Sequence, residues 1–158
     1  MKRTVAREIA VRLCFAVSEN PAPPKEALEQ LFNKEYYSTL QEEDKLYAAA
    51  PDKKQKQYIN SVVTGVYEHI SELDTYIEKH SVGWKSNRIS KTAKAIMRIA
   101  MYEVLYMQDI PTKVAINEAV ELAKKYESPE TCSFINGILG SFSRALDECV
   151  SDAEVSDG

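Results

Sequence analysis

Cysteine is scarce in this sequence of 158 residues, and its three cysteines lie far apart. Cys14, Cys132 and Cys149 are odd in number, which excludes a complete set of disulfide pairs, and their spacing fits no common metal site. Structural disulfides belong to oxidising compartments, so the cysteine content favours a reducing one, the cytoplasm.

Long apolar runs are also absent. No stretch reaches the roughly 20 apolar residues that a membrane-spanning helix needs. At the N-terminus, Arg7, Glu8 and Arg12 interrupt the apolar run that a secretory signal peptide requires. The sequence therefore predicts a protein that neither enters a membrane nor carries a signal peptide.

The patterns that mark common catalytic sites are missing as well. His69 and His80 are eleven residues apart, which does not fit the H-E-x-x-H zinc motif. The sequence contains no glycine-rich phosphate loop, no G-x-S-x-G elbow and no C-x-x-C motif. We therefore expect no catalytic residue, no metal site and no cofactor, and the sequence favours a non-enzymatic protein.

Helical periodicity, by contrast, runs through most of the sequence, and no segment shows the alternation of a strand. Residues 96–107 are apolar or aromatic except for Arg98 and Glu103, which predicts a central helix covered on most sides. Each of these two charges should have a partner, because an unpaired charge in an apolar helix is costly. Pro111 should end this segment, and a second helix from Thr112 would complete a helical hairpin.

The remaining helices are expected to surround this hairpin in a compact all-α bundle. We predict helices over residues 3–18 and 25–37, a long helix from the N-cap Asp52 to Ile77, and a last helix that begins at Ser128-Pro129. Residues 38–53 show weak periodicity and should be loop or short helix. The sequence favours one domain over residues 1–150 and a disordered acidic tail over residues 151–158.

Charge is distributed unevenly around the net value of −4. Residues 81–102 carry five basic side chains and no acidic one, whereas the last twelve residues carry five acidic side chains and no basic one. Binding of a polyanion depends on the local field more than on the total charge. Each run taken alone is more typical of a solvated face.

The segment 3–18 combines an apolar face with a basic one. One arc, expected to face the core, contains Val5, Ile9, Leu13 and Ala16. A second arc, expected to be exposed, contains Arg3, Thr4, Arg7, Val11 and Phe15. Guanidinium groups beside an aromatic ring suit single-stranded RNA, although Phe15 could equally pack on a neighbouring helix. Arg12 is spaced to be partly neutralised by Glu8.

A longer pattern brings a known family into view. The segment AIMRIAMYEVLYMQDIPTKVAINEAVELAKKY (95–126), followed by FINGIL, resembles the signature region of the NusB family of bacterial transcription antitermination factors. The similarity extends through residues 64–66 and 72–74 to residues 7–15, so it covers nearly the whole chain. It implies an all-helical fold of two small three-helix subdomains packed across each other, and no catalysis.

The resemblance also implies partners. Family members bind the boxA element of nascent ribosomal RNA transcripts, as single-stranded RNA, in a heterodimer with NusE, a small-subunit ribosomal protein. Other Nus factors and RNA polymerase join that complex, which suppresses premature termination. A homodimer that buries the same RNA-binding face is an alternative state.

Site residues carried over from the resemblance fall in three places. RNA-binding side chains are expected in the first helix and at the start of the last one, and they are Lys2, Arg3, Arg7, Arg12, Phe15, Glu130, Phe134 and Asn136. The start of the last helix also offers free backbone N–H groups that suit a phosphate. NusE is expected to dock around Trp84, Arg88, Lys94 and Arg98.

The sequence departs from the family pattern twice. Thr4 and Val5 stand where relatives have further arginines, so we expect weaker RNA binding by the isolated protein and more dependence on NusE. Ala93 stands where relatives often have an acid, so the partner interface should use other contacts. Two alternatives remain: a helical protein–protein adaptor with little RNA binding, and the N-terminal domain of an rRNA cytosine methyltransferase, which would need a further α/β domain.

Overall fold

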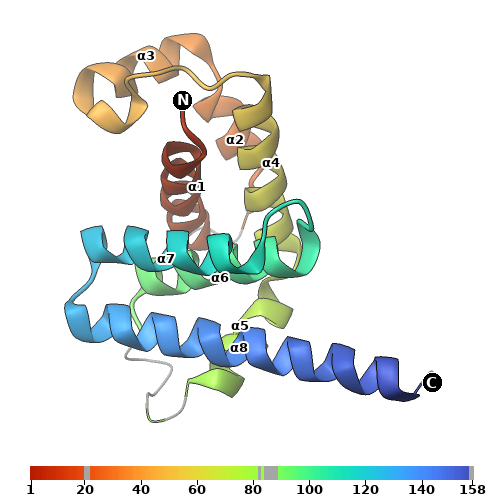
Figure 1. The fold of residues 1–158 in the computed structure, drawn as a ribbon. Helices are drawn as coiled ribbons and strands as arrows, with labels where there is room; N and C mark the ends of the chain where they lie inside the picture. Colours follow the sequence, from red (N-terminus) through yellow and green to blue (C-terminus); the bar gives the residue numbers. More distant parts are fainter. Residues whose placement is uncertain (20–21, 82, 84–88, 157–158) are drawn as a thin grey trace. The chain divides into compact units, whose positions relative to one another are not determined.

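The computed structural model describes residues 1–19, 22–81, 83 and 89–156 (Figure 1). Within these ranges the regular secondary structure is entirely helical, which confirms the all-α prediction. The chain divides into two compact units, Met1–Ile70 and Ser71–Gly158, which we call the first and second unit and describe separately. The prediction of a single domain over residues 1–150 stays a prediction.

The first unit contains five helical segments. They are α1 (Arg3–Ser18), α2 (Lys25–Leu31), α3 (Lys34–Glu43), the 3-10 helix η1 (Lys45–Tyr47) and α4 (Lys53–Glu68). Helix α1 packs against α4, and both supply fully buried apolar side chains such as Ile9 and Val62. Asp52 caps α4 as predicted: its carboxylate accepts the Gln55 N–H at 3.0 Å, and the Gln55 side chain accepts the Asp52 N–H at 2.9 Å.

Two predicted boundaries in this part of the chain are wrong. The helix predicted over residues 25–37 ends at Leu31, because the Asn33 side chain accepts the Tyr36 N–H at 3.1 Å and starts a new helix, α3. That helix continues to Glu43, into the segment predicted to be loop or short helix. The long helix predicted from Asp52 is interrupted at His69, which leaves helical geometry without any glycine or proline to mark the break.

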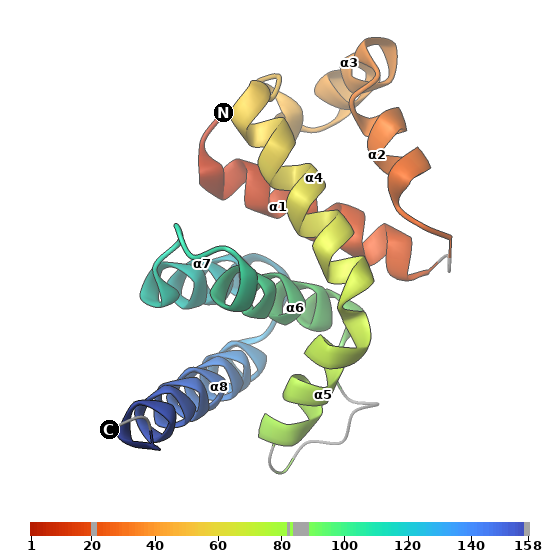
Figure 2. The ribbon, with the colours of Figure 1, turned by 90° about the vertical axis from the view of Figure 1, so that its right-hand side faces the viewer.

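The second unit contains α5 (Ile70–His80, whose first residue belongs to the first unit), α6 (Lys91–Tyr106), α7 (Thr112–Tyr126) and α8 (Pro129–Ser156). Helices α6 and α7 lie side by side, and α8 packs against both (Figure 2). Pro111 precedes α7, which confirms the predicted helical hairpin. Helix α6 is its buried centre, since Ile96, Met97 and Ile99 are at most 1% exposed.

The start of α8 forms as its sequence predicts. The Ser128 hydroxyl accepts the Thr131 N–H at 3.2 Å, and Pro129 is the first helical residue. Ile135, Ile138, Leu139 and Phe142 form the predicted buried stripe, while Leu146 is partly exposed. Helix α8 extends to Ser156, and the disorder expected for residues 151–158 stays a prediction.

Candidate nucleic-acid interface

The arginines of α1 occupy three different environments. Arg3 is exposed, and its Cζ lies 4.4 Å from the centroid of the Tyr58 ring, a cation–π distance. Arg7 is only 3% exposed, and its Cζ lies 5.7 Å from the same ring. Arg12 is partly exposed, and its Cζ lies 6.0 Å from the Tyr47 ring. The ring of Tyr58, itself buried, thus meets two guanidinium groups.

The faces predicted for α1 are partly wrong. Arg7 and Val11 are buried rather than exposed, whereas Ala16, assigned to the core, is exposed. Ile9 is buried as predicted, and the buried stripe also contains Ala6, Ala10 and Cys14, at four-residue spacing. The prediction followed the larger apolar residues, but small side chains let α4 approach closely. Arg3 is exposed as predicted, as are Lys2 and Phe15, the latter 39% exposed.

Arg12 has a partner that the sequence pattern did not reveal. Its Nη1 lies 2.7 Å from Oδ2 of Asp44, a residue 32 positions along the chain. The other carboxylate oxygen of Asp44 accepts the Leu46 N–H at 2.9 Å. Both interactions hold the pKa of Asp44 below its usual range. The hydrogen bond from the Leu46 N–H has the larger effect, and that from Arg12 follows. The sequence could not indicate this pair, because only the tertiary fold brings the two residues together.

The second set of predicted RNA-binding residues lies at the start of α8, in the second unit. Glu130 and Asn136 are exposed there, and Phe134 is half-buried. The structure therefore assigns the predicted set to both units: Lys2 to Phe15 belong to the first, and Glu130 to Asn136 belong to the second.

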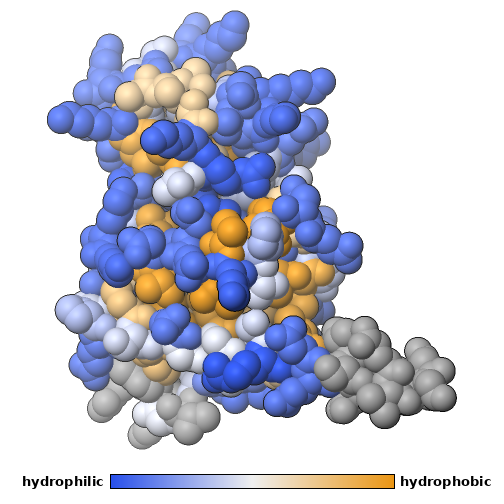
Figure 3. All heavy atoms as spheres, viewed as in Figure 1, coloured by the Kyte–Doolittle hydropathy of each residue, from blue (hydrophilic) through white to orange (hydrophobic). Residues whose placement is uncertain are grey.

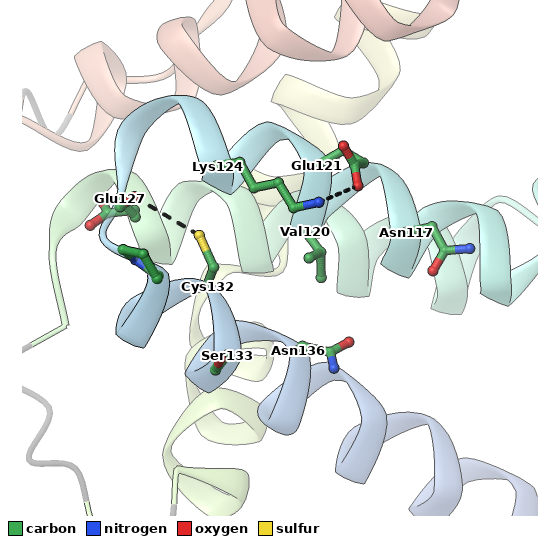
Figure 4. Close-up of a pocket in the computed structure, with 9 residues that line it drawn as sticks. Asn117, Val120, Glu121, Lys124, Glu127, Cys132, Ser133 and Asn136 are labelled. Carbon is green, nitrogen blue, oxygen red and sulfur yellow. Dashed lines mark hydrogen bonds and ion pairs between the residues drawn. The ribbon is translucent and has the colours of Figure 1, made fainter.

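A groove of about 740 Å³ runs between α7 and α8 and includes Asn136 (Figure 4). Its other lining residues are Asn117, Val120, Glu121, Lys124, Glu127, Pro129, Cys132 and Ser133. On the face shown in Figure 3, hydrophobic surface is visible between the hydrophilic side chains that follow α7 and α8. Sequence reasoning missed Asn117, although this asparagine belongs to the I-N-E-A stretch of the quoted family segment.

The predicted NusE-docking residues are described only in part. Trp84 and Arg88 lie outside the described residues. Lys94 is partly exposed on α6, whereas Arg98 binds Asp74 of α5 through two hydrogen bonds, of 2.7 and 2.9 Å. The partner expected for Arg98 is thereby confirmed. Ala93 is fully buried in the first turn of α6.

The buried polar groups of the described residues are all satisfied. Glu103 is 0% exposed and takes part in a polar interaction, as expected for a charge inside α6. Across the described part of the chain, no buried side-chain nitrogen or oxygen lacks a hydrogen-bond partner. The same residues contain no cluster of three or more potential metal ligands and no helix long and apolar enough to span a membrane.

Comparison with known proteins gives consistent matches. Residues 4–144 match the model of the NusB family. The chain is 43% identical over 142 residues to the transcription antitermination protein NusB of Agathobacter rectalis, covering 90% of this chain and 99% of that relative. The structure of T. maritima NusB superimposes with a TM-score of 0.66 at 28% identity, covering 91% of this chain and 92% of that one.

A further solved structure shares the fold. It is a chain from the crystal structure of the antitermination factors NusB and NusE in complex with dsRNA, with a TM-score of 0.69 at 22% identity. The superposition covers 90% of this chain and 96% of that one.

Proposed function

The chain belongs to the NusB family of transcription antitermination factors, which are not enzymes, and we propose that it acts by binding boxA RNA together with NusE. The boxA element would lie in nascent ribosomal RNA transcripts. The family match over residues 4–144 carries this proposal. A chain of the same fold comes from a structure that contains NusB, NusE and RNA, which supports the choice of partners.

In the first unit, the exposed part of α1 would hold the RNA backbone and one base. Lys2 and Arg3 are exposed cations that can reach phosphates, and Phe15 offers a ring on which a base can stack. The Tyr58 ring beneath Arg3 restricts the orientations of its guanidinium, which lowers the entropy lost on binding. Arg7 is buried, so we assign it a supporting role beside Tyr58.

The remaining partners follow from the family. We propose that NusE docks near the start of α6, at Lys94 and the Arg98–Asp74 pair, with Trp84 and Arg88 close in sequence. The complex would then join other Nus factors and RNA polymerase in the cytoplasm. A homodimer that buries the RNA-binding face is the alternative state.

The alternative is a protein–protein adaptor with little RNA binding, and charge reversal on α1 distinguishes the two. We expect the Lys2→Glu and Arg3→Glu double variant to bind boxA RNA at least about tenfold more weakly, because two phosphate contacts are replaced by repulsion. Its affinity for NusE should not change. Fluorescence anisotropy of labelled boxA RNA measures the first quantity, and calorimetric titration with NusE the second.

Arg7 is unsuitable for this test, because a carboxylate at its buried position would disturb folding. Lys34→Glu, which changes an exposed cation on α3, provides a matched control in the same unit. If the α1 variant binds boxA RNA as tightly as the wild type and the control, the adaptor is the better interpretation.

A further inference from the structure

Two asparagines face each other across the α7–α8 groove. Figure 4 shows Asn117 on α7 and Asn136 on α8 directed toward the space between the helices, with Val120 on α7 above Asn136. Both asparagines are exposed. Among the described residues, neither carboxamide has a hydrogen-bond partner. Each carboxamide can therefore pair with a ligand in the groove at no cost in internal hydrogen bonds.

The charges in the groove disfavour a phosphate. Among the described residues its one cation, Lys124, is bound to Glu121 at 2.7 Å, and this interaction raises the pKa of the lysine. Glu127, which also lines the groove, accepts a hydrogen bond from Ser90 at 2.5 Å. In the part of the lining that the structure describes, two carboxylates therefore accompany one paired ammonium, so a neutral ligand fits this lining better than an anion.

A nucleobase has the chemistry that the lining accepts. A carboxamide presents a carbonyl acceptor beside an N–H donor, so it pairs in bidentate fashion with a base edge that offers a donor beside an acceptor. All four bases present such an edge, and single-stranded RNA exposes it. Val120, Pro129 and the buried Cys132 supply apolar surface for the ring face, and a volume of about 740 Å³ admits a base with its sugar.

We propose that the α7–α8 groove binds one unstacked base of the RNA, recognised by the carboxamides of Asn117 and Asn136. The inference rests on the proposed function, because it requires that the protein bind RNA. Asn136 belongs to the RNA-binding residues expected at the start of α8, so the groove continues that surface within the second unit. The groove adds sequence discrimination, whereas the cations of α1 add affinity for any strand.

Alanine variants of the full-length protein test this site. Asn117→Ala and Asn136→Ala replace exposed helical residues with the best helix former, so both variants should fold. We expect each to bind boxA RNA about 5- to 100-fold more weakly, the equivalent of one bidentate base contact, with unchanged affinity for a scrambled RNA. Gln108→Ala, which removes an exposed carboxamide outside the groove, is the matched control.

Substituted RNAs locate the base. In anisotropy titrations with boxA RNAs from which each base is removed in turn, the wild type should lose affinity at one abasic position where the asparagine variants do not. Equal boxA affinity of wild type, variants and control would overturn the groove assignment but leave the proposed function intact. Equal losses for boxA and scrambled RNA would overturn base recognition, and reduced NusE binding without RNA would reassign the groove to protein docking. If the wild type itself shows no boxA preference, alone or with NusE, both the proposed function and this inference fail.

Discussion

The basic side chains of the N-terminal segment are not equivalent cations. Lys2 and Arg3 are exposed, Arg7 is buried, and Arg12 shares its charge with Asp44. Fewer phosphate contacts are therefore available than the four basic residues suggest. Since single-strand affinity follows the number of such contacts, this arrangement supports the prediction that the isolated protein binds RNA weakly.

Asp44 offers a test of this reasoning. Asp44→Asn removes the carboxylate charge beside Arg12 while keeping an oxygen that can accept the Leu46 N–H. We expect tighter boxA binding and a salt dependence steeper by up to about 0.7 in log–log slope, the value of one added phosphate contact. Anisotropy titrations at several salt concentrations measure both, and an unchanged slope would show that Arg12 does not reach the RNA backbone.

The same substitution has a predictable pH signature. The pKa of Asp44 is lowered in the folded protein, so its charged form stabilises the fold at any pH above the unfolded pKa, near 3.8. As the pH falls from there through the lowered folded pKa, this contribution is lost. The difference in unfolding free energy between wild type and Asp44→Asn should therefore be constant at neutral pH and shrink below about pH 4. A constant difference down to strongly acidic pH would contradict the pairing.

At the scale of residues, the sequence predicted those features that depend on neighbouring residues in the chain. The apolar surroundings of Arg98 and Glu103 in the sequence predicted that both would need partners, and both have them. The Arg12–Asp44 pair and the burial of Arg7 depend on how helices pack, which helical periodicity alone does not determine.

At the scale of elements, helix α5 buries Leu73 and Ile77 and also makes polar and aromatic contacts with α6 and α8. Asp74 and Glu72 of α5 bind Arg98 and Tyr106 of α6, the latter pair at 2.7 Å. On the other side, His80 lies 2.8 Å from the Ser141 hydroxyl of α8. The Tyr76 ring also lies edge-on to that of Phe142, with centroids 5.0 Å apart.

The Arg98–Asp74 pair should contribute most among these polar contacts. Its arginine side chain is only 11% exposed, so Asp74→Ala would leave a largely buried guanidinium without this partner. We expect the free energy of unfolding to fall by about 1–3 kcal/mol, measured by urea denaturation. Glu121→Gln is the control, because it weakens the exposed Lys124–Glu121 pair and should cost less than about 1 kcal/mol. Equal losses of unfolding free energy in the two variants would show that burial does not strengthen the Arg98–Asp74 pair.

Element boundaries were predictable where a specific residue marks them. Side-chain caps and proline favour a helix start or end at a defined position. The structure begins a helix directly after each such residue that the sequence analysis used: Asp52, Pro111 and Ser128. Asn33 is also a good cap, but the apolar residues on both sides of it hid the boundary. The break at His69 has no local signal, so only the folded structure reveals it.

At the scale of the whole molecule, the candidate RNA-binding residues belong to both compact units. The first unit carries exposed cations and an aromatic ring on α1, and the second carries the α7–α8 groove with its two asparagines. The family, and with it the fold class, was accessible from the sequence because the segment 95–126 is long and specific. The groove was not, because it exists only where two helices pack side by side.

The central claim is that this protein binds boxA RNA and that NusE strengthens the binding. Fluorescence anisotropy of labelled boxA RNA, titrated with the wild-type protein alone and then with NusE, tests it most directly, with a scrambled RNA and two salt concentrations as controls. We predict a preference for boxA, a shallow salt dependence for the protein alone, and tighter binding with NusE. No preference in either condition, despite NusE binding, would contradict the account and leave a protein–protein adaptor.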